Sequence, residues 1–201
     1  MFTLAITGGI GSGKSVVSGI LRLKELPVYD TDSEAKRLMN EDESLKNKLI
    51  IAFGQKIYPE HLEGRLDRIA LAKIIFNNQD AIRLVNSIVH PEVKRDFISW
   101  REKRQKEGYP GVALESAILF SAKIEDVATH IVAVTASEMT RIERVSHRDH
   151  APKEAILARI RSQMSQEEII DRSDFVISND RDDLIIPQVD KMLTTINTIG
   201  N

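Results

Sequence analysis

The segment Gly8–Ser15, with the sequence GGIGSGKS, constrains this chain most, because it matches the pattern GxxxxGK[ST]. The apolar, β-prone stretch Phe2–Thr7 precedes it and predicts a buried strand, and apolar residues at helical spacing follow it. A glycine loop between a strand and a helix lets backbone N–H groups curl around an anion at the positive end of the helix. The segment therefore predicts a phosphate-binding loop within an α/β fold.

Two side chains at the end of this loop have expected roles of their own. Lys14 would reach the β- and γ-phosphates of a nucleotide, and the Ser15 hydroxyl would bind Mg²⁺. A glycine-rich turn that binds nothing is the alternative, and the strand and helix on its flanks argue against it. The dinucleotide fingerprint GxGxxG fails, because the last glycine that it requires, counted from Gly9, is Lys14. We therefore predict a nucleoside triphosphate as the ligand.

Composition limits the class of protein. The 201 residues suffice for one domain with a sizeable core and inserted subdomains. A formal net charge of −2 gives no support to general binding of nucleic acids or membrane surfaces. The chain has no cysteine, which excludes disulfides and thiolate metal sites and favours a reducing compartment. Without a signal-like start or a long apolar run, we expect a cytoplasmic protein that binds neither nucleic acid nor membrane. Its oligomeric state cannot be deduced from the sequence.

Two carboxylates follow the second predicted strand, residues 27–29. Asp30 and Asp32 lie at its end, and a helix is expected from Ser33, with Thr31 or Asp32 as its N-cap. In an open parallel sheet, ligands bind beyond the carboxyl ends of the strands. Capping explains only one of the two carboxylates, so we expect at least one of them to function beside the phosphate loop.

A third carboxylate, Glu115, ends the predicted strand 111–114. Such a position is typical of a ligand to Mg²⁺ or its waters, although Glu115 could instead cap the segment from Ser116. Further strands are expected at 130–135 and 174–178. The order of elements predicts a parallel five-stranded sheet flanked by helices.

The alternation of strands and helices is interrupted between the second and third strands. Residues from about 39 to 106 show helical periodicity, far more than a compact βαβ crossover needs. We predict a helical insertion over 33–108 that holds the second substrate; the alternative is a purely structural insertion. Because Pro91 disfavours a helical residue before it, we expect the helix to break or kink at His90-Pro91.

An arginine-rich segment follows the fourth strand. Arg141, Arg144 and Arg148 are spaced at three and four residues, so they share one helix face. A solvated basic face is one interpretation. We favour a closing lid over 139–172, whose guanidinium groups clamp the transferring phosphoryl group. The remaining segments, 1–32, 109–138 and 173–201, would form a nucleotide-binding core within a single domain, 1–201.

These parts favour a small-molecule kinase over a GTPase switch. A GTPase would carry an Asn-Lys-x-Asp signature, and the closest approach, residues 179–182, lacks the lysine. Another P-loop kinase, acting on nucleosides or nucleoside monophosphates, has the same parts. An ATP-binding regulatory module with little turnover is an alternative of another class, and the carboxylate pair argues against it.

Several phrases occur together in one order along the chain: Thr7–Ser15, Val28–Asp32, Gly64–Arg68, His90-Pro91, Gln163 and Ser178-Asn179. In this order and spacing the chain resembles the dephospho-CoA kinase family over nearly its whole length. The resemblance implies a nucleoside-kinase-like P-loop fold. It also implies ATP-dependent phosphorylation of the ribose 3′-hydroxyl of dephospho-CoA, the last step in making coenzyme A.

The resemblance also implies residue roles. The ATP site would comprise Gly9, Gly11, Ser12, Gly13, Lys14, Ser15, Val16 and Asn179. Asp32 would orient or deprotonate the acceptor hydroxyl, and dephospho-CoA would be contacted by Asp32, Arg68, His90 and Glu115. Arg144 and Arg148 match lid positions, and with Lys14 and Asp32 they form the expected catalytic set. The chain departs from the family at Val16, commonly threonine, and around Glu115, where bulkier apolar residues are more usual.

Overall fold

The computed structural model describes residues 1–76 and 78–199. The chain divides into two compact units. Residues 1–30, together with those from Arg101 onward, form the first unit, and Thr31–Trp100 forms the second. No helix in the described part of the chain is long and apolar enough to cross a membrane.

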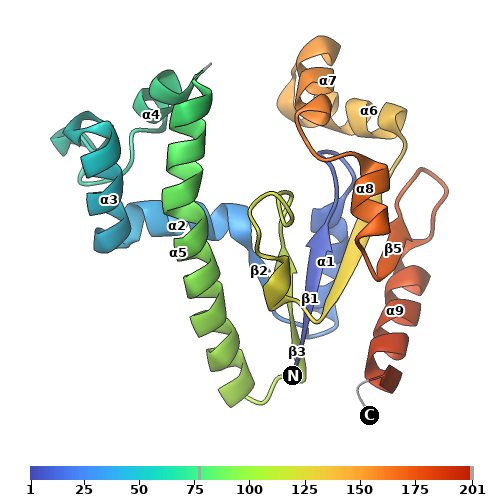
Figure 1. Ribbon diagram of the computed structural model, residues 1–201. Coiled ribbons are helices and arrows are strands. Elements are labelled where there is room, and N and C mark those ends of the chain that lie inside the picture. Colours follow the sequence, from blue (N-terminus) through green and yellow to red (C-terminus); the bar gives the residue numbers. More distant parts are fainter. Residues whose placement is uncertain (77, 200–201) are drawn as a thin grey trace. The chain divides into compact units, whose positions relative to one another are not determined.

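The first unit is built on a parallel sheet. Its described residues form five strands: β1 (Phe2–Thr7), β2 (Val28–Asp30), β3 (Gly111–Glu115), β4 (His130–Thr135) and β5 (Phe175–Ser178). Their order is β2-β3-β1-β4-β5, and every neighbouring pair is parallel. The predicted fold class is therefore confirmed. Because β1 is the central strand, the loop that follows it opens at the middle of the carboxyl edge (Figure 1).

The described helices of the first unit are α1 (Lys14–Leu23), α6 (Glu138–Asp149), α7 (Lys153–Arg161), α8 (Gln166–Asp171) and α9 (Ile185–Ile199), with a 3₁₀ turn, η3 (Glu125–Val127). Of these, α1, α8 and α9 pack against the strands, and α6 packs against α7. One apolar cluster joins β1, α1 and α9 through Leu4, Leu21 and Met192. The buried stripe of α1 follows from the helical spacing of Val17 and Leu21, which are both fully buried.

The second unit is helical. It holds α2 (Thr31–Glu41), α3 (Glu43–Phe53), α4 (Arg68–Ile75) and most of α5 (Gln79–Lys106), with 3₁₀ turns η1 (Gln55–Ile57) and η2 (Glu60–Leu62). Two helix boundaries follow from local residue types. Asp67 caps α4 by accepting from the N–H groups of Ile69 and Ala70, and Gly54 ends α3 with a φ of 86°.

We predicted a break or a kink at His90-Pro91, and the break is wrong, because α5 runs without interruption through Pro91. Proline has no N–H to donate to the carbonyl four residues earlier, so one helical hydrogen bond is missing. A buried stripe continues across this position at intervals of four residues: Ala81, Val85, Val89, Val93 and Phe97. The packing of this stripe offsets the cost of a proline in a helix interior, about 3 kcal/mol.

The expected cap of α2 is also wrong. The helix begins at Thr31, directly after β2, so Thr31 and Asp32 lie in its first turn and neither precedes it. The strand itself is Val28–Asp30, one residue later than predicted. An acidic residue in the first turn still interacts favourably with the helix dipole, which makes an Asp here compatible with the helix.

Candidate active site

The phosphate loop has a backbone that only glycine adopts readily. Gly11 and Gly13 have φ values of 79° and 94°. A Cβ on Gly11 would lie 2.7 Å from the Arg141 carbonyl oxygen, and one on Gly13 would overlap the Asn179 amide. The glycines of the pattern are therefore required by conformation and by close approach.

The loop presents free donors at the start of α1. The N–H groups of Gly11 and Gly13 have no hydrogen-bond partner within the described residues, and α1 begins at Lys14. Ser15 is exposed on the first helical turn. Such donors, aligned with the positive end of a helix, suit a phosphate group.

Lys14 bends back over the loop. Its Nζ donates to the carbonyl oxygens of Gly8 at 2.9 Å and Gly9 at 3.2 Å. The ammonium group is therefore held beside the loop by the same backbone that would surround a phosphate. This is the position from which a lysine of this motif reaches phosphate oxygens.

Two predicted site residues hold the carbonyl side of the loop. Asn179 Nδ2 donates to the Ser12 carbonyl at 2.8 Å, and Arg144 Nη1 lies 3.4 Å from the Gly11 carbonyl. Arg144 Nη2 also donates to Asn179 Oδ1 at 3.3 Å. These bonds link the end of β5, the loop and α6, and Asn179 at their centre is only 5% exposed.

Arg141 was predicted only as a member of the lid face, and its contact with the loop was not predicted. It is 6% exposed, and its Nε donates to the Ile10 carbonyl at 2.9 Å. Burial lowers the pKa of its guanidinium. The signal was its spacing of three residues from Arg144, which predicted a shared helix face without showing which members of that face point to the loop.

Arg148 lies differently from Arg144. Its Nε pairs with Asp149 at 2.7 Å, and 64% of its side chain is exposed. Asp149 also pairs with Arg159 at 2.8 Å. Its contact with Arg148 is the main reason that the pKa of the Asp149 carboxyl lies below its usual value. The structure thus brings Arg144 to the loop and joins Arg148 to its own neighbour in sequence.

Two carboxylates meet at the carboxyl edge of the sheet. In the parallel register, Asp30 on β2 lies opposite Glu115 on β3, and Glu115 lies opposite Ile6 on β1. The described segment after Glu115 forms turns with no α-helix before β4, so Glu115 does not cap one. It ends its strand beside the strand that leads into the phosphate loop.

The other predicted site residues belong to the Thr31–Trp100 unit. Asp32 is exposed in the first turn of α2, and Arg68 is exposed as the first residue of α4. His90 is half-buried in the middle of α5, and this burial lowers the pKa of its imidazole below the ordinary value of 6.5. The imidazole is therefore neutral at pH 7.

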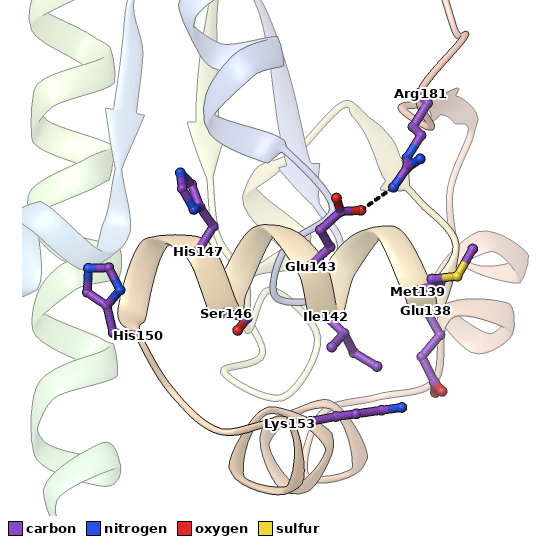
Figure 2. A pocket seen from close by; sticks show the side chains of 9 residues that line it. All are labelled: Glu138, Met139, Ile142, Glu143, Ser146, His147, His150, Lys153 and Arg181. Atoms are coloured by element: carbon purple, nitrogen blue, oxygen red, sulfur yellow. Dashed lines mark hydrogen bonds and ion pairs between the residues drawn. The ribbon is translucent and has the colours of Figure 1, made fainter.

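A pocket of about 820 Å³ lies on another face of α6. Figure 2 shows side chains of α6 around it, with Lys153 from α7 and Arg181 from the segment after β5. Its lining contains none of the predicted site residues: Glu138, Met139, Ile142, Glu143, Ser146, His147, His150, Lys153 and Arg181. The candidate active site therefore rests on the phosphate loop rather than on this pocket.

Comparisons with known proteins agree on one family. The dephospho-CoA kinase family model matches residues 2–183. A dephospho-CoA kinase of Bacteroides fragilis is 40% identical over 186 residues, which cover 92% of this chain and 88% of the relative. One from Porphyromonas gingivalis is 39% identical, covering 98% and 96%. A crystal structure from Thermus thermophilus matches with a TM-score of 0.77 and 32% identity, covering 98% and 96%. The motifs predicted this result, and the chain belongs to the dephospho-CoA kinase family.

Proposed function

We propose that this chain transfers the γ-phosphoryl group of ATP to the ribose 3′-hydroxyl of dephospho-CoA, giving coenzyme A and ADP, the final step of coenzyme A biosynthesis. One observation carries the proposal: a loop with free N–H donors, braced by Arg144 and Asn179, in a chain of this family. The family identifies the acceptor, and the loop supplies the chemistry of the donor.

The donor half would bind ATP at the phosphate loop. The residues in it are Gly9, Gly11, Ser12, Gly13, Lys14, Ser15 and Val16. Free N–H groups of the loop bind phosphate oxygens, and Lys14 neutralises charge on the β- and γ-phosphates. Asn179, which holds Ser12, lies beside the loop and positions the nucleotide.

Mg²⁺ is the metal that this arrangement fits. Ser15 presents an exposed hydroxyl on the first turn of α1. The described residues contain no cluster of three or more carboxylate or imidazole ligands. This donor set fits a hard cation that keeps its waters and is shared with phosphates. When bound, the ion would neutralise charge on the β- and γ-phosphates.

The acceptor half would orient the 3′-hydroxyl. Asp32 accepts a hydrogen bond from this hydroxyl and takes its proton late, because phosphoryl transfer depends mainly on positioning and charge neutralisation. Arg68, His90 and Glu115 contact dephospho-CoA. Arg68 and His90 lie in the helical insertion, 33–108, for which we propose the acceptor-binding role.

The lid, 139–172, would cover the transferring phosphoryl group. Arg144 and Arg148 supply positive charge as the bonds to the γ-phosphate loosen. Arg144 starts from its contacts with Gly11 and Asn179. Arg148 must exchange its pairing with Asp149 for a phosphate oxygen. The core segments, 1–32, 109–138 and 173–201, carry the nucleotide throughout.

ADP release with different acceptors tests this function directly. We expect release with Mg-ATP and dephospho-CoA, and only background with AMP or nucleosides. Lys14→Met should lose activity, whereas the matched Lys24→Met, which removes an ion pair with Asp190 at the other end of α1, should retain it. Equal or greater release with AMP or a nucleoside would show another kinase. ATP binding without any acceptor-stimulated release would show a regulatory module.

A further inference from the structure

The backbone of Ile10, in the phosphate loop, is held from both sides by the lid. Its N–H donates to Gln163 Oε1 at 2.8 Å, and its carbonyl accepts from Arg141 Nε at 2.9 Å. Arg141 lies on α6, at the start of the lid. Gln163 lies between α7 and α8, towards the end of the lid. Two side chains 22 positions apart thus satisfy both polar groups of one residue.

Arg141 donates to a carbonyl oxygen of the loop, the Ile10 carbonyl. In this motif the N–H groups bind the anion, so the bond leaves these donors unoccupied. The guanidinium also lies so close to Gly9 that a Cβ there would overlap it, and the Arg141 carbonyl lies 2.7 Å from where a Cβ on Gly11 would be. Arg141 therefore fits against the loop on both flanks of Ile10.

The burial of Arg141 removes a charged side chain from water. Arg141 is 6% exposed, and none of the ion pairs found among the described residues includes it. Burial lowers the pKa of its guanidinium, and the Glu138 carboxylate, which forms no ion pair with it, offsets this effect only in part. The burial is therefore unfavourable unless the donors of the guanidinium are used. The Ile10 carbonyl is the acceptor that the structure gives its Nε. The bond thus accounts for a burial that stability alone disfavours.

Gln163 completes the arrangement from the other side. Its side chain lines a small pocket of about 100 Å³ together with Thr7, the last residue of β1, and Ile118 from the turns after β3. It therefore sits where the strand before the loop, the turns after Glu115 and the end of the lid come together. Because the Ile10 N–H donates to Gln163, it is not available to an anion, whereas the N–H groups of Gly11 and Gly13 have no partner within the described residues.

We propose that Arg141 and Gln163 are positioning residues that hold the phosphate loop in its nucleotide-binding shape from the two ends of the lid. The inference rests on the proposed function only in taking the loop as the ATP site. A loop rich in glycine has many accessible conformations, and each fixed residue costs conformational entropy. The two hydrogen bonds to Ile10 order the loop before ATP binds. ATP binding therefore does not have to meet the entropy cost of ordering it.

Amide exchange at Ile10, without nucleotide, tests the bond itself. Gln163→Met keeps the size of the side chain and removes the acceptor, so exchange of the Ile10 amide should accelerate about tenfold. Gln163→Glu keeps an acceptor oxygen and should restore slow exchange. Gln166→Met is the matched control, because Gln166 accepts from a backbone N–H of Ala136, outside the loop. Unchanged Ile10 exchange in Gln163→Met would overturn the proposal.

ATP kinetics test what the bond does. Gln163→Met and Arg141→Met should each lower kcat/KM for ATP about tenfold, the equivalent of about 1.4 kcal/mol, and change KM for dephospho-CoA much less. Arg141→Lys, which keeps the charge and a donor, should recover part of the loss. Arg159→Met is the control within the lid, since Arg159 pairs with Asp149. Losses as large in Arg159→Met or Gln166→Met would show a general structural effect and overturn the proposal.

The double variant separates joint action from independent effects. Because both side chains hold the same residue, the combined loss should be clearly smaller than the product of the single losses. Multiplicative losses would show two unrelated contributions. ATP affinity is measured in parallel without acceptor, and melting temperature reports on folding. If ATP binding weakens as expected while dephospho-CoA fails as acceptor, the proposed function fails and this inference stands.

Discussion

At the scale of single residues, the phosphate loop depends on polar side chains that lie far away in the sequence. Asn179 is 167 positions from Ser12, whose carbonyl accepts from its amide. Arg141 is 131 positions from Ile10. A buried carbonyl left without a donor costs about 1–3 kcal/mol, so each distant side chain has a measurable share in the shape of the loop.

The proposed activation of the acceptor hydroxyl depends most on the carboxylate of Asp32. We expect Asp32→Asn to lower kcat about 100-fold or more, because the amide cannot take the proton of the hydroxyl. ATP affinity should change little. Steady-state kinetics and a nucleotide titration check both parts, with the exposed Asp80→Asn as control. A kcat close to that of the unmodified chain would remove Asp32 from the mechanism.

His90 gives the fold a dependence on pH. Burial lowers the pKa of its imidazole in the folded chain, so the unfolded chain binds more protons once the pH falls below 6.5. The free energy of unfolding should therefore decrease as the pH falls from 6.5 through the folded pKa, and this contribution should be constant above 6.5. Urea unfolding across this range measures it. His90→Gln should show a shallower decrease; an identical pH profile would contradict the prediction.

At the scale of elements, α6 presents different residues to different surroundings. Arg141, Arg144 and Val145 approach the loop, and Ile142 and Ser146 line the pocket of Figure 2. A helix turns by about 100° per residue, so positions three and four apart share a face. This periodicity was visible in the sequence. The side that faces the loop was decided by packing.

The two lid arginines should therefore differ when each is replaced. Arg144→Met loses contacts to Gly11 and Asn179, so ATP affinity and kcat should both fall. Arg148→Met loses only the pairing with Asp149, so ATP affinity should be nearly unchanged and kcat should fall about 10²-fold. Both should leave KM for dephospho-CoA nearly unchanged. A change confined to that KM would argue against a lid.

Helix α5 allows the cost of a proline inside a helix to be compared with the packing that keeps the helix continuous. Pro91→Ala restores an N–H in the middle of a helix that is already continuous. The free energy of unfolding should rise by about 3 kcal/mol, the typical cost of a proline in a helix interior. Chemical denaturation measures it, with the exposed Glu102→Ala on the same helix as control. A lower stability would mean that the ring of Pro91 packs more favourably than the missing bond costs.

At the scale of the whole molecule, the predicted site residues divide between two compact units. The phosphate loop, Arg144 and Asn179 belong to one, and Asp32, Arg68 and His90 belong to the other. A kinase must bind ATP and its acceptor together, and a protein with two units can bind one substrate on each. Ligand binding should therefore be visible unit by unit.

ATP alone should protect the unit that holds the loop. With ATP and Mg²⁺ at 100 times the Kd, the native state gains about 2.7 kcal/mol by mass action. Hydrogen exchange should slow most at residues 8–15 and in α6, and least in the Thr31–Trp100 unit. Dephospho-CoA alone should slow exchange most in the Thr31–Trp100 unit, and in the other unit mainly around Glu115. Equal protection of both units by ATP alone would contradict this division of labour.

The sequence by itself determined the local features: the strand, glycine loop and helix of the phosphate site, the cap at Asp67, and the α/β class. Each depends on residues a few positions apart, whose spacing encodes conformation directly. Only the tertiary structure decided the rest. Pro91 lies inside a continuous helix because a buried stripe outweighs one lost bond. Ile10 is held by Arg141 and Gln163 because the fold brings them together. Contacts between residues far apart in the sequence produce no periodic pattern in a single chain. Their contribution to stability depends on how deeply the fold buries them.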